Sequence, residues 1–308
     1  MKILITGGKG MLGRDLQDEL KDVAELFPVA HSDCEITEAA SLQRLLAQIR
    51  PQVVINCAAY TDVDGCERSP ELAMAVNAHG AGNVARAAEQ VGARVYHIST
   101  DYVFDGSDRR GQENYSPGPG QKVPIEYVET DAINPLSLYG KSKLEGEKEV
   151  LTGGNRAGHL VIRTSWLYGI HRVNFIDRVM EQAQRGGPVK AVTDQISCLT
   201  WTRDLARSIA RLAKQDASRK AGGILHLAGT GRSTRFENAR HVLDWMKEQG
   251  KLAQPVEMVG TTWPALNLPA RRPVFSAMTS ARFAELGIEA LPDWRASLNG
   301  YLALRSKA

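Results

Sequence analysis

Short apolar runs alternate with longer amphipathic stretches through the first half of the chain. This alternation is typical of β-strands that alternate with α-helices and pair in a parallel sheet. In the first amphipathic stretch, the apolar residues that share one helical face are Met11, Leu12, Leu16 and Leu20. Their spacing predicts a helix that packs on the sheet. The predicted strands are residues 2–6, 26–30, 53–57, 95–99 and 160–164.

The second half of the chain is less regular. After Trp166 the alternation weakens, and it resumes with a predicted helix over residues 202–214 and a predicted strand over residues 224–228. We therefore expect a second, discontinuous domain. Residues 106–124 are rich in Gly, Pro and Ser and lack apolar periodicity, which predicts a long loop. We expect this loop at the mouth of the site, and the alternative is a passive surface insertion.

The segment between the first predicted strand and the first predicted helix is a glycine-rich turn, residues 6–13, with the sequence Thr-Gly-Gly-Lys-Gly-Met-Leu-Gly. Gly7 permits a tight turn, Gly10 lets the backbone approach a pyrophosphate, and Gly13 lets the helix pack closely on the strand. The N–H groups at the helix N-terminus favour phosphate. A purely structural turn is the alternative, but the strand–turn–helix context favours dinucleotide binding.

The end of the second predicted strand bears on the choice between NAD and NADP. An acidic residue there binds the ribose hydroxyls of NAD and repels a phosphate, whereas this chain has Ala30. His31, Ser32 and Arg14 can each donate a hydrogen bond to a phosphate, although Asp33 follows directly. We predict NADP(H) as the cofactor, with NAD(H) as the alternative. The other interpretation makes His31 and Ser32 ordinary loop residues.

Tyr139 and Lys143 lie four residues apart, so on a helix they share one face. A phenol is a weak acid near neutrality, and we expect the Lys143 ammonium to lower the pKa of Tyr139. Tyr139 then protonates a carbonyl oxygen while a nicotinamide delivers hydride, and Lys143 also binds the ribose. Thr100 ends the predicted strand 95–99, at the sheet edge where ligands bind, and is placed to hydrogen-bond the same carbonyl. A solvated helix face is the alternative for the Tyr–Lys pair.

Composition excludes several other classes. The 308 residues, 43% of them hydrophobic, suffice for a cofactor domain and a smaller companion. The net charge of +3 is dispersed, so no nucleic-acid surface is expected. The apolar run after Met1 is too short for a signal peptide or a membrane span, and we expect a soluble, cytoplasmic protein. The irregularly spaced cysteines indicate neither a disulfide framework nor a metal site: they are Cys34, Cys57, Cys66 and Cys198.

The chain resembles the extended short-chain dehydrogenase/reductase family, and more closely the dTDP-4-dehydrorhamnose reductases. The motifs that carry the resemblance are residues 7–13, 56–64, 99–106, 134–136 and 163–166. It implies a Rossmann-type, doubly wound parallel sheet with a smaller substrate domain, and NADPH-dependent reduction of the 4-keto group of a nucleotide-linked deoxysugar. We expect the NADP(H)-binding domain over residues 1–168 and 200–230, the substrate-binding domain over residues 169–199 and 231–308, and a monomer or homodimer.

The resemblance also implies roles for individual residues. Catalysis falls to Thr100, Tyr139 and Lys143. The implied substrate-binding residues are Asp101, Tyr102 and Trp166 at the sugar, with Asn174 and Gln195 at the nucleotide end. The predicted cofactor-binding residues are Gly7, Gly10, Met11, Leu12, Gly13, Arg14, His31, Ser32, Ala58, Ala59, Tyr60, Asn77, Ser99, Tyr139, Lys143, Thr164 and Ser165. Alternatively, Asn77 caps a helix that begins near Gly80, and Trp166 is a core residue.

Two stretches depart from the family pattern. Residues 194–200 lack the usual Gly and Pro, and Phe275 stands where the family has an amide. We expect these changes to make the substrate pocket more apolar and to alter selectivity among nucleotide sugars.

Other activities fit less well. A dehydratase needs a carboxylic acid where this chain has Tyr102, and a fucose-synthase type of epimerase-reductase needs a Cys/His pair in the pocket. A non-catalytic alternative is the dinucleotide-binding regulatory subunit of methionine adenosyltransferase, which resembles the same family. Trp166 favours the reductase, because a substrate-facing aromatic residue has no evident purpose in a scaffold.

Overall fold

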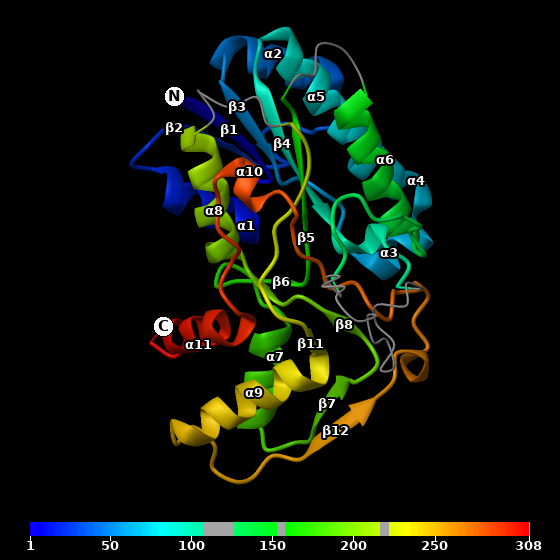
Figure 1. The fold of residues 1–308 in the computed structure, drawn as a ribbon, viewed down its shortest axis with the longest axis vertical. Helices are drawn as coiled ribbons and strands as arrows, with labels where there is room; N and C mark the ends of the chain where they lie inside the picture. Colours follow the sequence, from blue (N-terminus) through cyan, green and yellow to red (C-terminus); the bar gives the residue numbers. More distant parts are fainter. Residues whose placement is uncertain (107–125, 153–157, 216–221, 308) are drawn as a thin grey trace, which may run out of the picture.

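The computed structural model describes residues 1–106, 126–152, 158–215 and 222–307. A parallel sheet of six strands forms the centre of the upper part of Figure 1. Its strands are β1 (Lys2–Thr6), β2 (Glu25–Val29), β3 (Val53–Asn56), β4 (Arg94–Thr100), β5 (Leu160–Thr164) and β10 (Gly223–His226). Each neighbouring pair in the order β10-β5-β4-β3-β1-β2 is parallel. The predicted fold class and strands are confirmed, with boundaries shifted by one or two residues.

Helices cover both faces of this sheet. On one face α1 (Met11–Leu20) packs against α8 (Thr202–Gln215), and α10 (Phe283–Leu286) lies nearby (Figure 1). The other face is covered by α2 (Ala39–Ile49), α5 (Ala81–Gln90) and α6 (Leu138–Thr152), while α3 (Val63–Arg68), α4 (Pro70–Met74) and the π-helix η1 (Ala75–Gly80) lead into α5. Strand order reverses between β1 and β3, so a crevice is expected at the carboxyl ends of these strands.

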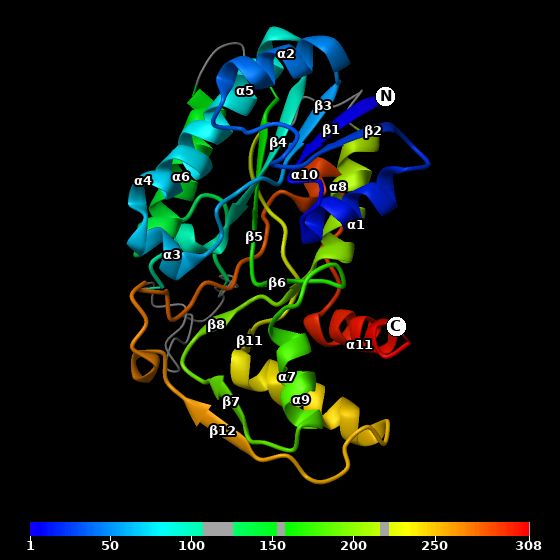
Figure 2. The same ribbon diagram turned by 180° about the vertical axis from the view of Figure 1, so that it is seen from behind.

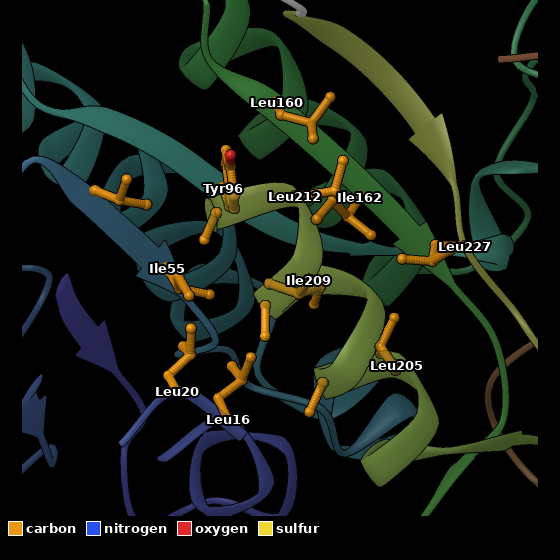
Figure 3. Close-up of a cluster of buried hydrophobic side chains, with 14 of the residues drawn as sticks. Leu16, Leu20, Ile55, Tyr96, Leu160, Ile162, Leu205, Ile209, Leu212 and Leu227 are labelled. Atoms are coloured by element: carbon orange, nitrogen blue, oxygen red, sulfur yellow. The ribbon is translucent and has the colours of Figure 1, made fainter. Parts of the chain in front are cut away.

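Leucines spaced along α1 and α8 build the core on one face of the sheet. Leu16 and Leu20 of α1 meet Leu205 and Ile209 of α8, and all four side chains are fully buried (Figure 3). Burying each such side chain contributes about 1.5–3 kcal/mol. This packing fixes the position of α1 relative to the sheet, and with it the position of the glycine turn that precedes α1.

Three two-stranded sheets and three α-helices lie below the central sheet in the described part of the chain (Figure 2). The parallel pairs are β6 (Leu167–Tyr168) with β9 (Thr200–Trp201) and β7 (Val189–Val192) with β12 (Met258–Thr261), and β8 (Ile196–Ser197) pairs antiparallel with β11 (Ser233–Thr234). The helices are α7 (Phe175–Gln184), α9 (Arg235–Glu248) and α11 (Trp294–Arg305). Their aromatic core includes Trp201, Trp294 and Tyr301.

The segment around α10 packs away from the elements that precede it in sequence. Leu286, Ile288 and Leu291 join the hydrophobic cluster beneath the central sheet, although residues 231–308 are predicted to form the second domain. The domain division itself stays a prediction. Most of the predicted loop 106–124 lies outside the described residues; only Gly106 is described, with φ of 73°. Among the described helices, none has the length and apolar character needed to cross a bilayer.

Candidate active site

A cavity of about 890 Å³ opens at the carboxyl ends of β1, β3 and β4. This volume is in the range of small-molecule sites. The predicted site residues that line it are Gly7, Gly10, Met11, Leu12, Gly13, His31, Ala58, Ala59, Tyr60, Ser99, Thr100, Asp101, Tyr139, Lys143, Thr164, Ser165 and Trp166. The cavity therefore joins the glycine turn, the Tyr–Lys pair and the Thr-Ser-Trp segment, which are far apart in sequence.

The glycine turn has the geometry that the sequence predicts. Gly7 has φ of 66°, and a Cβ atom there would lie 2.9 Å from the backbone carbonyl carbon of Cys57. At Gly13 a Cβ atom would collide with the carbonyl oxygen of Gly7. Helix α1 starts after Gly10 without a side-chain cap, so its first N–H groups are available to a phosphate at the cavity.

Of the two predicted phosphate donors that follow β2, only one lines the cavity. His31 lines it and lies 3.4 Å from Glu35. Ser32 does not, because its Oγ donates to Asp33 Oδ1 at 3.1 Å. The other Asp33 oxygen accepts from the backbone N–H of Ala30 at 2.9 Å, and these hydrogen bonds hold the pKa of Asp33 below its ordinary value. Asp33 is thus turned back on its own loop and does not line the main cavity.

Arg14 does not line the main cavity either. It faces an adjoining cavity of about 400 Å³, together with Asp33 and Asp18. Lys9 lines both cavities and is a cation that the sequence reasoning missed, although it lies inside the glycine motif. Further lining residues that it missed are Cys34, Glu35, Ile36, Leu72, Val76 and Arg172. Their segments carry no motif that marks them as cavity residues.

Tyr139 and Lys143 both face the cavity from the first turns of α6, and Thr100 faces it from the end of β4. Burial raises the pKa of Tyr139 well above that of a free phenol, and a hydrogen bond with Thr100 offsets this only in part. The expectation that Lys143 lowers the pKa of Tyr139 is wrong. The Lys143 ammonium instead donates to the carbonyl oxygen of Ile98 at 2.7 Å.

Lys143 ends a buried chain of polar side chains. Its Nζ lies 3.2 Å from Nε2 of His97, and Asn56 Nδ2 donates to His97 Nδ1 at 3.0 Å. Thr6 Oγ1 donates to Asn56 Oδ1 at 2.6 Å. Burial lowers the pKa of Lys143 to about 8 and, with the Lys143 charge, lowers that of His97 well below its ordinary value. Sequence reasoning missed His97, whose signal is a histidine within an apolar strand.

Asn77 supports the cavity wall without lining it. Its Oδ1 accepts from Tyr60 N at 2.8 Å, and its Nδ2 donates to Tyr60 O at 3.0 Å and to Ser142 Oγ at 3.0 Å. Asn77 lies inside η1, which continues into α5. The alternative in which it caps a helix near Gly80 is therefore wrong.

Asp101 is a buried hub rather than a free ligand group. Its Oδ2 accepts from Ser276 Oγ at 2.6 Å, from Ser197 Oγ at 2.9 Å and from Ser165 Oγ at 3.2 Å. Burial raises the pKa of Asp101, and the serine hydroxyls partly offset this rise. These serines come from three separate segments, so Asp101 ties the carboxyl end of β4 to β8 and to the segment after Arg272.

The remaining predicted substrate residues have different surroundings. Tyr102 meets Tyr139 edge to face, with ring centroids 5.8 Å apart. Asn174 caps α7 through hydrogen bonds from Ile176 N and Asp177 N, so its side chain is already engaged. Gln195 is buried, and its Nε2 has no hydrogen-bond partner among the described residues. None of the three lines the main cavity.

The two departures from the family pattern pack away from the cavity. Phe275 and Cys198 are buried in one hydrophobic cluster with Phe104 and Tyr127, and Leu199 is fully buried as well. Ser197 and Leu199 stand at the positions of the lost Gly and Pro, and neither they nor Phe275 line the main cavity. The expectation that these residues make the pocket more apolar is wrong, because core packing takes up their side chains.

The parallel sheet, the glycine turn and the Tyr–Lys pair at one cavity define the class of the extended short-chain dehydrogenases/reductases. A family model described as RmlD substrate binding domain matches residues 1–306. The chain belongs to this family.

Relatives and solved structures agree with this assignment. A dTDP-4-dehydrorhamnose reductase from Streptomyces griseus is 37% identical over 96% of this chain and 91% of its own. A probable dTDP-4,6-dihydroxy-2-methyloxan-3-one 4-ketoreductase from Streptomyces antibioticus is 35% identical over 97% of this chain and 93% of its own. The structure of dTDP-4-dehydrorhamnose reductase from Bacillus anthracis in complex with NADP has a TM-score of 0.86 and 30% identity, covering 98% of this chain and 99% of that one. The resemblance seen in the motifs is confirmed.

Proposed function

We propose that this protein reduces the 4-keto group of a dTDP-linked deoxysugar with NADPH, as a dTDP-4-dehydrorhamnose reductase does. The observation that carries the proposal is that Thr100, Tyr139 and Lys143 face one cavity that also holds the glycine turn. The names of the relatives support the substrate class. The predicted monomer or homodimer and cytoplasmic location stay predictions.

The cavity fits a dinucleotide. Gly7 and Gly13 leave no room for side chains where a pyrophosphate would approach, and α1 offers uncapped N–H groups. Deeper in the cavity, the buried hydroxyl of Thr164 has no hydrogen-bond partner among the described residues. An unsatisfied buried hydroxyl is costly, so a polar group of a bound ligand is its natural partner.

The residues supply the proton and hold the carbonyl. When bound, the nicotinamide supplies a hydride to the carbonyl carbon. The raised pKa of Tyr139 keeps its hydroxyl protonated at neutral pH, and Tyr139 donates that proton to the carbonyl oxygen as negative charge develops there. Thr100 hydrogen-bonds the same oxygen, and Lys143 provides a positive charge in the wall of the same cavity. The product is an alcohol, and Tyr139 then takes a proton back from solvent.

A panel of dTDP-, UDP- and GDP-linked 4-keto sugars, compared by kcat/KM for NADPH oxidation, tests this function. The panel includes the ketosugar named for the Streptomyces antibioticus relative, because that relative matches the chain almost as well as the rhamnose enzymes do. We expect a strong preference for a dTDP-linked ketosugar. Binding of NADPH without reduction of any panel member would overturn the proposal in favour of the non-catalytic regulatory subunit.

A further inference from the structure

Arg235 is the first residue of α9 and lies beside the predicted sugar site. Its guanidinium carbon stands 4.0 Å from the centroid of the Trp166 ring and 4.9 Å from that of Phe175. Trp166 itself lines the main cavity. The two aromatic rings hold the guanidinium in one place and shield it from water, which strengthens any interaction it makes with a negative charge.

Among the described residues, Arg235 forms no ion pair and no hydrogen bond through its side chain. The carboxylate of Glu237, two residues along the same helix, accepts hydrogen bonds from the N–H and the hydroxyl of Thr234. Burial lowers the pKa of Arg235 to about 10, so the group is still charged at neutral pH. Its five N–H donors are thus available to a ligand.

The surroundings add positive charge. Besides burial, the charge of Arg272 lowers the pKa of Arg235, whereas Tyr102 and Asp101 oppose this fall. Burial and Asp101 raise the pKa of Tyr102, and both arginines partly offset that rise. Arg272 is neutralised by Asp64, with Nη2 to Oδ2 at 2.9 Å, whereas Arg235 is not paired. Since Tyr102 packs on the catalytic Tyr139, these charges lie one aromatic ring away from the reacting group.

A second donor belongs to the segment that pairs with the residues before Arg235. In the antiparallel pair of β8 and β11, Thr234 is opposite Ile196, and Arg235 and Gln195 are the residues that follow this last pair on the two strands. The buried Nε2 of Gln195 has no partner among the described residues. Asp194 fixes the segment before it by accepting from Trp263 N at 2.8 Å. A guanidinium and an amide N–H that have no hydrogen-bond acceptor in the described part of the chain, and that lie on well-anchored segments, are suited to bind phosphate oxygens.

We propose that Arg235 binds a phosphate of a nucleoside diphosphate group, with the amide of Gln195 as a second donor. The inference rests on the proposed function and on the family resemblance, which implies that the sugar lies at Trp166 and Tyr102. It assigns Arg235 to the anionic part of the substrate and leaves the chemistry to Tyr139.

The test is calorimetric titration of the NADPH-saturated enzyme with dTDP, UDP, GDP and thymidine. We expect Arg235→Met, which keeps the stacked stem, to weaken binding of the preferred diphosphate by roughly 10- to 100-fold, because charge-assisted hydrogen bonds are lost. Arg235→Lys should lose less, since it keeps the charge but not the planar fork. Arg240→Met is the matched control, because Arg240 lies on the same helix and stacks on Phe236 at 5.1 Å.

The outcomes separate this site from the reductase activity. Arg235→Met that weakens dTDP but not thymidine supports the proposal, even if the wild type reduces no ketosugar. Unchanged diphosphate affinity in Arg235→Met overturns it, and so does an equal loss for thymidine or a wild type that binds none of the diphosphates. A lower Tm with normal affinity would show that Arg235 only stacks. Any of these can occur in an enzyme that still reduces the sugar, so the proposed function is judged by the ketosugar panel alone.

Discussion

Two arginines near the cavity have opposite surroundings. Arg163, near the carboxyl end of β5, is 1% exposed and pairs with Glu147 of α6 through two hydrogen bonds of 2.9 and 2.7 Å. Arg235 lies between two aromatic rings and has neither an ion pair nor a hydrogen bond among the described residues. Both guanidinium groups are partly or fully removed from water. Arg163 has a carboxylate partner, whereas Arg235 is stabilised by the two rings and by the more distant charge of Asp101.

The difference distinguishes a charge that stabilises the fold from a charge that is available to a ligand. A buried ion pair with good hydrogen bonds connects the elements that carry it. Here it connects α6 to β5, one helical turn after Lys143. A guanidinium without a partner costs the fold free energy, so a ligand is the expected source of compensation. Substitutions in the Arg163–Glu147 pair should therefore lower stability, and substitutions of cavity residues or of Arg235 should lower binding or turnover.

The largest expected effect is on the functional side. Tyr139→Phe should lower kcat by roughly 10²- to 10⁴-fold, because it removes the proton donor and leaves the ring. Affinity for NADPH and the free energy of unfolding should stay close to the wild type. Tyr96→Phe is the control, since it removes the hydroxyl of a core tyrosine outside the cavity. Normal turnover by Tyr139→Phe would remove Tyr139 from the proposed chemistry.

On the structural side, Glu147→Gln should lower the free energy of unfolding by about 3–5 kcal/mol, because it leaves Arg163 buried without its counter-charge. Denaturant unfolding measures this loss. Glu149→Gln is the matched control on the same helix, and should cost less than about 1 kcal/mol because its ion pair with Arg86 is exposed. Equal losses in the two variants would contradict the distinction between the pairs.

The pH dependence of activity sharpens the comparison. Burial lowers the pKa of Lys143 from 10.5 to about 8, and the charge of Glu147 limits that fall. Above pH 8 the free enzyme therefore loses the Lys143 ammonium, and kcat/KM should decrease as the pH rises through this value. In Glu147→Gln the decrease should begin at lower pH. If the pH dependence of kcat/KM is unchanged in this variant, Glu147 has only a structural role.

Loss of the Lys143 proton also changes the free energy of unfolding, in a direction that follows from its lowered pKa. The unfolded chain keeps the Lys143 proton up to about its ordinary pKa of 10.5, whereas the folded chain releases it near 8. Unfolding free energy should therefore rise with pH across this window, relative to Lys143→Met, in which the rise is absent. Lys143→Met should also weaken turnover and NADPH binding. Parallel stability curves for the two proteins would contradict the lowered pKa.

The smallest expected effect is on cofactor choice. We expect NADPH to bind more tightly than NADH, because Asp33 is turned away and Lys9 lines both cavities. Lys9→Gln should weaken NADPH by roughly 10-fold and leave NADH nearly unchanged, since one charge-assisted contact is lost. Lys21→Gln, an exposed lysine at the end of α1, is the control. Equal losses for both cofactors would place Lys9 at the pyrophosphate instead.

Sequence patterns predicted the cofactor side of the cavity closely. Gly7, Gly13, Tyr139 and Lys143 face it as expected, because strand–turn–helix geometry and helical spacing are local properties. The substrate side was predicted poorly. Asn174 is engaged as a helix cap, and Phe275 packs in the core. In both cases a motif position indicated a role, but the direction of the side chain depends on packing from distant segments.

The sequence by itself determined the alternation of strands and helices, the glycine turn and the family. Each of these follows from residue types and their spacing within short segments. Only the tertiary structure decided which charges have partners. Arg163 pairs with Glu147, and Asp101 accepts hydrogen bonds from the serines at positions 165, 197 and 276. Arg235 stacks on two aromatic rings and forms no ion pair among the described residues. Such pairing depends on contacts between residues far apart in the chain, and no local pattern encodes it.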